Sequence, residues 1–245
     1  LLARDLAARR LLLAHAGTKL GSKAWEFATP LLLLHLSPYA DDISAPTIFG
    51  LAVFALKFIL GPAAGRWMDS TPSLEVINVG IALQAAAVTG AVVVLAASFA
   101  ASAFWWPILV GMIACGVVEA LGALVSSVAV EKDWVPTLYA GEGAELSAIN
   151  AAMANIDLAA EMIGPLVAGL ALDLLGGSLG FLVVGIANTL TFGLELGLLR
   201  SLYHLRAPLR APKPVVSTAA ADGGGGGGGG LRLAMGAMLD AWAVF

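Results

Sequence analysis

Long apolar stretches separated by short polar turns run through most of the chain. Each stretch holds about 20 or more mostly apolar residues, the length that an α-helix needs to cross the hydrocarbon core of a bilayer. The turns between them, such as DSTPS and GGSLG, contain the Gly, Pro, Ser and Asp residues that break helices. The pattern predicts an all-α membrane protein whose residues 1–206 form a bundle of six spans, over residues 10–36, 47–67, 74–98, 106–130, 147–175 and 179–203.

The composition supports lipid as the surroundings of these helices. Hydrophobic residues make up 59% of the 245 residues and charged residues 12%, and the mean hydropathy is +0.90. Soluble domains carry about 25% charged residues. The net charge of −4 is spread along the chain without a basic patch, which argues against nucleic acid as a partner. The single cysteine, Cys115, rules out a disulfide framework and a thiolate metal cluster.

Basic residues near the ends of the predicted spans all fall on one side of the membrane if there are six spans. The opposite loops hold Asp41, Asp42 and Asp173 but no Lys or Arg. Cytoplasmic loops carry an excess of Lys and Arg, so both ends of the six-helix unit are expected on the cytosolic or stromal side. The basic residues are Arg4, Arg9, Arg10, Arg66, Lys132, Arg200, Arg206, Arg210 and Lys213.

The composition changes after the sixth span. Residues 207–230 are rich in Pro and Ala and end in eight consecutive Gly, which predicts a flexible linker. Residues 231–245 resemble the start of another helix, which predicts the beginning of a truncated second half.

Several ionisable residues lie inside the predicted spans, where each costs several kcal/mol unless it faces a bundle interior or a water-filled path. At about 100° per residue, polar side chains of the first span share one helix face, and those of the fifth span share another. Two such stripes predict a shared cavity, although Lys23 and Glu26 could also simply neutralise each other. The stripes consist of His15, Lys19, Ser22 and Glu26 in one span and Asn150, Asp157 and Glu161 in the other.

Asp157 and Glu161 lie one turn apart and repel each other unless a cation, a proton or a lysine compensates. Oxygen ligands suit a divalent metal, and the same acids suit a proton relay, so the spacing does not choose between them. In the second span, Gly61 and Gly65 also lie one turn apart and predict a close helix contact, with Asp69 in the turn that follows.

The segment AVEKDWVPTLYAGEGAELSAINAAMANIDLAAEMIGPLVAG resembles the junction of spans four and five in the ferroportin family, solute carrier family 40. The segments WEF, GPAAGRWMD and ANTLTFGLELGLL resemble further parts of the same family, so that the resemblance covers residues 10–206. It implies the N-terminal half of an iron exporter of the major facilitator superfamily, most similar to the plastid-type branch of plants and algae. The expected membrane is therefore a plastid envelope or another organelle membrane.

The resemblance also implies two sets of functional residues. Animal-type members carry Asp and His where this chain has Ser22 and Glu26, and Asn where it has Glu161, so the ligands shift from imidazole toward oxygen. Without an imidazole ligand, the site would prefer Fe²⁺ or Co²⁺ less strongly and would tolerate Mn²⁺ or Ca²⁺ better. The metal is the transported substrate, and no cofactor is expected. The implied metal ligands are Glu26, Asp157, Glu161, Asn188 and Ser22, and the implied inside gating network is Gly65, Asp69, Glu131, Lys132, Asp133 and Glu142.

Other functions remain open on the sequence alone. The chain could carry a metal chelate or an organic cation, or it could be an inactive half, because alternating access requires a second bundle. An intramembrane enzyme is disfavoured, since the chain contains neither an H-E-x-x-H nor a G-x-S-x-G motif.

Overall fold

The structure is a computed structural model that describes residues 6–34, 43–100 and 105–210, all within one compact unit. Every regular element in these residues is helical, which confirms the predicted fold class. The long helices are α1 (Leu6–Leu34), α2 (Ser44–Ser70), α3 (Ser73–Ala100), α4 (Trp105–Val128), α6 (Gly143–Leu175) and α7 (Gly177–Leu205). Each contains most of one predicted span, because the apolar runs that form a helix and the turn residues that end it can be recognised without knowledge of the helix's neighbours.

Shorter elements extend two of these helices. A π-helix, η1 (Ala129–Trp134), and a short helix, α5 (Val135–Leu138), continue α4 without a break, and a 3-10 helix, η2 (Ala207–Arg210), follows α7. Leu209 of η2 is buried, so the start of the predicted linker packs onto the bundle through this side chain. The rest of that linker and the predicted start of a second half, together with Arg4, Asp41, Asp42 and Lys213, lie outside the described residues.

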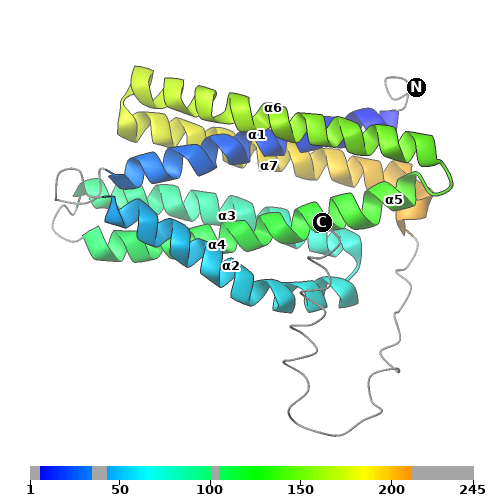
Figure 1. Cartoon of the computed structure of the whole chain (residues 1–245), viewed down its shortest axis with the longest axis horizontal. Coiled ribbons are helices and arrows are strands. Elements are labelled where there is room, and N and C mark those ends of the chain that lie inside the picture. Colours follow the sequence, from blue (N-terminus) through cyan, green and yellow to red (C-terminus); the bar gives the residue numbers. More distant parts are fainter. Residues whose placement is uncertain (1–5, 35–42, 101–104, 211–245) are drawn as a thin grey trace, which may run out of the picture. The chain divides into compact units, whose positions relative to one another are not determined.

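The helices form two groups of three (Figure 1). α1 contacts α6 and α7, and α4 contacts α2 and α3 in the same manner, while α3 and α7 meet between the groups. Under this correspondence α1, α2 and α3 take the places of α4, α6 and α7, so each spatial group combines helices from two consecutive three-helix units. Nested repeats of three consecutive helices are typical of each half of a major facilitator transporter.

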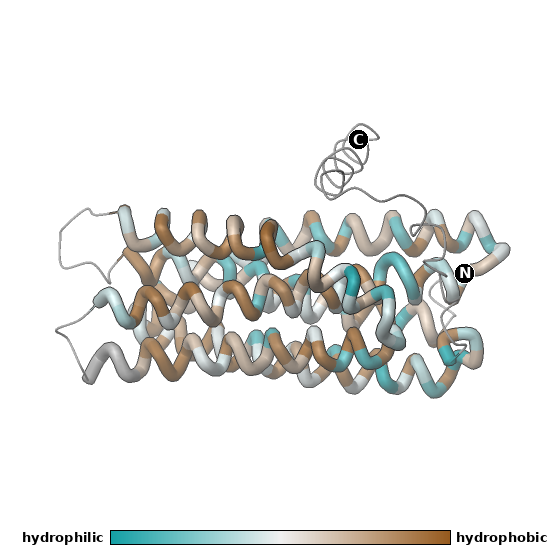
Figure 2. Tube along the Cα trace, turned by 90° about the horizontal axis from the view of Figure 1, so that it is seen from below, coloured by the Kyte–Doolittle hydropathy of each residue, from teal (hydrophilic) through white to brown (hydrophobic). Residues whose placement is uncertain are grey.

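Five of the described helical segments are long and apolar enough to cross a membrane, and α1 is the long helix that is not among them. The reason is that α1 carries Lys19, Lys23 and Glu26 along its middle. Large apolar side chains such as Phe54, Met162 and Leu190 are exposed on the outer faces of α2, α6 and α7. Figure 2 shows apolar positions along much of the helices and hydrophilic ones gathered toward the end where α1 begins. This distribution fits a bundle surrounded by lipid rather than water.

Small residues set the closest helix contacts, but not at the predicted positions. A Cβ atom added at Gly80 of α3 would lie 2.8 Å from the Gly122 carbonyl oxygen of α4, so these two backbones touch. The predicted contact at Gly61 and Gly65 is wrong: a Cβ at Gly65 would meet no described atom within 4 Å, and one at Gly61 only a Leu124 methyl at 3.9 Å. The physical reason is that α2 lies on the outside of the bundle.

The helices alternate in direction, so one end of the bundle collects the basic residues of the described helix ends. At this end, Arg10 donates to the Ser201 hydroxyl at 2.6 Å, and Arg200 donates to the Asn78 side-chain oxygen at 3.1 Å. Asp173 lies near the other end, close to the last residue of α6. The expected clustering of positive charge at one end is therefore present, while the side of the membrane stays a prediction.

Candidate functional site

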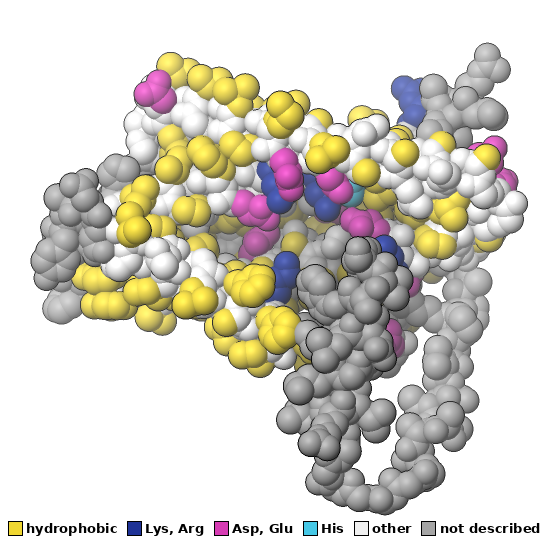
Figure 3. Space-filling view, viewed as in Figure 1, with side chains coloured by type: hydrophobic (Ala, Val, Ile, Leu, Met, Phe, Trp, Pro, Cys, Tyr) yellow, Lys and Arg dark blue, Asp and Glu magenta, His cyan; other side chains and the backbone are white. Residues whose placement is uncertain are grey.

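Charged side chains gather in a hollow near the middle of the bundle, between the group that contains α6 and the group that contains α2 and α4 (Figure 3). Few other charged side chains lie near the hollow on this face, so those in the hollow form one polar region. We call this set the cleft network. It comprises Lys19, Lys23 and Glu26 of α1, Glu131 of η1, Asp157 and Glu161 of α6, and His15 of α1.

The network has the form of a ladder between α1 and α6. Lys19 Nζ lies 3.5 Å from Asp157 Oδ1, and one turn further along both helices Lys23 Nζ lies 3.5 Å from Glu161 Oε1. The equal spacing of four residues on two helices that run in the same direction makes both rungs possible. His15 extends the ladder, because its Nε2 lies 2.8 Å from the same Asp157 Oδ1.

Each lysine also contacts a second carboxylate. Lys19 Nζ lies 3.6 Å from Glu131 Oε1, and Lys23 donates to Glu26 Oε2 at 3.0 Å. Lys19 therefore links α1 to both α6 and η1.

The register of the ladder depends on a close approach of α6 to α1. A Cβ atom added at Gly164 would lie 2.7 Å from Lys23 Cβ and 2.9 Å from the Ala24 backbone nitrogen. Only glycine leaves room for this contact, which places Glu161, one turn before Gly164, beside Lys23.

The π-helix η1 places the acids of the fourth span. Its backbone bonds skip five residues, as in the bond from the Val135 N–H to the Val130 carbonyl, and this widened turn changes the direction of the side chains that follow. Glu131 then faces Lys19, while Asp133 accepts a hydrogen bond of 2.9 Å from the Ser73 hydroxyl at the start of α3. The helical segment that begins with α4 ends only after Leu138, whereas the fourth span was predicted to end at residue 130. The turn that follows contains Gly141 with φ 83°.

The implied metal ligands do not converge in this conformation. No group of three or more His, Cys, Asp or Glu side chains arranged to hold a metal ion occurs in residues 6–34, 43–100 and 105–210. Glu26, Asp157 and Glu161 each contact a lysine. Asn188 is fully buried on α7, where its side-chain oxygen lies 3.5 Å from the Thr191 hydroxyl.

Ser22 lies on α1 between the two lysines, with its side chain partly exposed. Its membership of the metal site stays a prediction, as does that of the other implied ligands.

The implied inside network is only partly connected among the described residues. Glu131 and Asp133 make the contacts given above, to Lys19 and Ser73. The side chains of Asp69, Lys132 and Glu142 are exposed and form no ion pair within the described part of the chain. Gly65 lies on α2 beside open space. These residues could take a gating role only with a partner from elsewhere.

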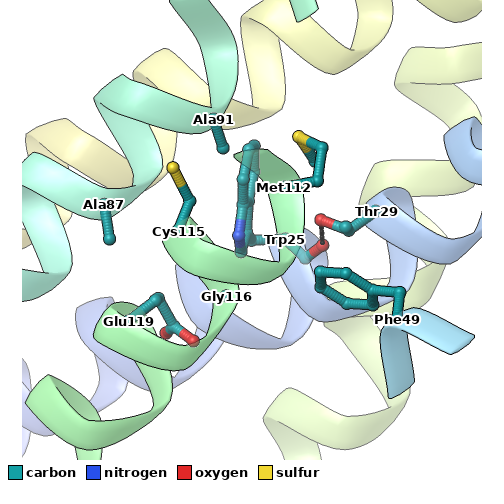
Figure 4. Close-up of a pocket in the computed structure, with 9 residues that line it drawn as sticks. All are labelled: Trp25, Thr29, Phe49, Ala87, Ala91, Met112, Cys115, Gly116 and Glu119. Atoms are coloured by element: carbon teal, nitrogen blue, oxygen red, sulfur yellow. Dashed lines mark hydrogen bonds between the residues drawn. The ribbon is translucent and has the colours of Figure 1, made fainter. Parts of the chain in front are cut away.

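The tryptophan of the WEF segment has a packing role. Trp25 is buried, its ring centroid lies 4.6 Å from that of Phe181, and a Cβ atom added at Gly185 would lie 3.1 Å from the Trp25 ring. Trp25 lines a small cavity of about 10 Å³ together with Glu119 of α4 (Figure 4). Such a volume holds about one water molecule.

The sequence did not reveal which lysine pairs with which carboxylate. The i, i+4 spacing of His15, Lys19 and Lys23 was the available signal, since it places all three on one face of α1. Their partners became known only once α1 and α6 lay side by side.

Comparisons with known proteins agree with this architecture. The chain is 29% identical to ferreportin of Bdellovibrio bacteriovorus over 202 residues, which cover 78% of this chain and 45% of the relative. It is 27% identical to solute carrier family 40 member 1 of Oryza sativa over 66% of this chain and 35% of the relative. It is 30% identical to the chloroplastic solute carrier family 40 member 2 of the same plant, over 61% and 26%. The chain thus spans less than half the length of these relatives.

Solved structures give the same result. A bacterial homologue of the iron transporter ferroportin in an outward-facing state matches with a TM-score of 0.76 at 25% identity, over 86% of this chain and 52% of that chain. The inward-facing state of such a homologue matches with a TM-score of 0.72 at 27% identity, over 83% and 52%. The Ferroportin1 (FPN1) family model matches residues 6–222, and the chain therefore belongs to the ferroportin family, a family of multi-pass membrane transporters.

Proposed function

We propose that this chain is the N-terminal half of a transporter that moves iron or a related divalent metal by alternating access, with the carboxylates of the cleft network forming its half of the metal site. The charge balance of the network is the observation that carries this proposal. Four carboxylates face two lysines, so with His15 counted as neutral the network has two unpaired negative charges. A divalent cation would neutralise that surplus.

The relatives support the direction of this proposal. One matched structure is that of a bacterial ferroportin homologue in an outward-facing state with soaked iron, with a TM-score of 0.75 at 27% identity. Because this chain covers about half of each solved homologue, the opposite wall of the transport path would come from a second six-helix bundle. Alternating access rocks two such bundles about a shared site, so transport requires that bundle.

His15 changes the expected choice of metal. The sequence suggested a set of oxygen ligands alone, but the imidazole of His15 lies 2.8 Å from Asp157. An ionised carboxylate only accepts, so Nε2 donates to it here; if this nitrogen lost its proton and bound the metal instead, a site with both groups would suit borderline metals such as Fe²⁺ and Co²⁺ as well as Mn²⁺. We therefore place Fe²⁺ first among the candidate substrates.

The basic end of the bundle would lie on the cytosolic or stromal side, following the positive-inside rule. A plastid envelope or another organelle membrane is the proposed location, supported by the chloroplastic relative from rice.

Isothermal titration of the purified, detergent-solubilised chain with Co²⁺ and Mn²⁺ tests this proposal. We expect saturable binding that is lost in Asp157→Ala and kept in Asp173→Ala, whose acid is exposed at the end of α6. Binding that survives Asp157→Ala would contradict the site. A chain that binds a metal chelate but no free metal would instead favour the chelate carrier.

A further inference from the structure

Lys19 and Lys23 occupy an unusual position between carboxylates. Each ammonium lies between two acids: Lys19 has oxygens at 3.5 and 3.6 Å, and Lys23 has oxygens at 3.0 and 3.5 Å. Both side chains are mostly shielded, with 27% and 30% of their surface exposed. A cation between two carboxylates is also the arrangement that a divalent metal adopts.

An ammonium and a metal cannot use the same oxygens at once. A protonated lysine has three donors and no lone pair, so it cannot itself be a metal ligand. All four contacts are longer than the roughly 2.7–2.9 Å of a strong charge-assisted hydrogen bond, and three of them are 3.5 Å or longer. The four-carbon lysine stem is flexible, so each ammonium can leave its carboxylates without movement of α1.

We propose that Lys19 and Lys23 are tethered cations that hold the cleft carboxylates in the absence of metal, and that a divalent metal binds only by displacing them. This inference rests on the proposed function. It makes both lysines specificity-determining residues, because every entering cation must bind the oxygens strongly enough to offset the lost ammonium contacts. A cation that binds oxygen weakly would then leave the site empty at concentrations where Fe²⁺ or Co²⁺ fills it.

A purely structural role for the lysines leads to a different expectation. If Lys19 only joined α1 to α6 and η1, its removal would loosen the carboxylates and would not favour metal binding. Removing any positive charge near the cleft would strengthen its attraction for cations. This non-specific charge effect must be distinguished from displacement of a lysine ammonium by the metal. Lys57 of α2 provides the matched control: it is close enough to interact electrostatically with Glu119, yet it forms no ion pair with another described residue.

The test is isothermal titration of Co²⁺ into the solubilised chain and into Lys19→Gln, Lys23→Gln and Lys57→Gln. We expect Lys19→Gln and Lys23→Gln each to tighten binding about tenfold or more, or about 1.4 kcal/mol, and Lys57→Gln to change it much less. The double variant Lys19→Gln/Asp157→Ala should not bind Co²⁺, as is expected of Asp157→Ala alone. Lys19→Arg keeps the charge and should bind no more tightly than the unaltered chain.

Three results would overturn the inference. If the unaltered chain binds Co²⁺ and neither glutamine variant binds it more tightly, displacement is wrong while the proposed site survives. If Lys57→Gln tightened Co²⁺ binding as much as Lys19→Gln and Lys23→Gln do, the effect would be explained by the loss of positive charge alone, and displacement would be wrong. Absence of binding in every variant would overturn both this inference and the proposed function. If Lys19→Gln fails to fold, as judged by circular dichroism and gel filtration, Lys23→Gln decides the matter independently.

Discussion

Gly164 of α6 meets Lys23 of α1 so closely that a Cβ atom added to the glycine would lie 2.7 Å from Lys23 Cβ. This contact sets the distance between the two helices that carry the ladder of lysines and acids. The chemistry of the cleft therefore depends on a residue without a side chain.

Gly164→Ala should push α6 away from α1, because the obstructing atoms include the Ala24 backbone nitrogen and cannot rotate aside. Overpacking of this kind costs about 1–3 kcal/mol, and the shift should weaken metal binding as well. Thermal unfolding in detergent and titration with Co²⁺ measure the two effects. Gly193→Ala on α7 is the matched control, since its Cβ would meet no described atom within 4 Å. Equal behaviour of the two variants would mean that the close contact is unimportant.

Asp157 and Glu131 should differ in their contribution to stability. Asp157→Asn weakens the contacts to both Lys19 and buried His15, whereas Glu131→Gln weakens a single ion pair, the 3.6 Å contact to Lys19; both carboxylates are themselves partly exposed. Exposed ion pairs contribute about 0–1 kcal/mol, so Glu131→Gln should lower the melting temperature little and Asp157→Asn more. The opposite order would show that η1, rather than α6, holds α1 in place.

Trp25 should matter for folding more than for metal binding. It is 5% exposed and packs between Phe181 and Gly185, and truncation of a buried Trp to Ala costs about 3–5 kcal/mol. Trp25→Phe should keep much of this packing and leave Co²⁺ affinity unchanged. Trp106→Ala, at a position that is 53% exposed, should change the melting temperature little in detergent. Loss of metal binding in well-folded Trp25→Phe would instead place this ring at the site.

The sequence predicted the helices well because their signals are local. The runs of apolar residues from Leu74 to Ser98 and from Ser147 to Leu175 are long enough to identify a span without any partner. Turn chemistry at GGSLG likewise placed the start of α7 within a few residues.

The contacts of the site are not local, and here the sequence was less informative. Lys19 and Asp157 are far apart in the chain, and their pairing depends on which helices are neighbours and in what register. The spacing of Gly61 and Gly65 suggested a close contact that α2 does not make, because the pattern alone cannot show which face of a helix is covered. The π-helical turn that aims Glu131 at Lys19 also has no simple sequence signal.

An anomalous difference map from crystals of the chain soaked in Mn²⁺ or Co²⁺ would show directly whether a metal binds the cleft carboxylates by displacing the lysines. We expect a peak at the carboxylates of Asp157 and Glu161, with the ammonium groups of Lys19 and Lys23 moved away from them. A peak elsewhere, or metal beside these acids with both lysines still in place, would contradict this expectation.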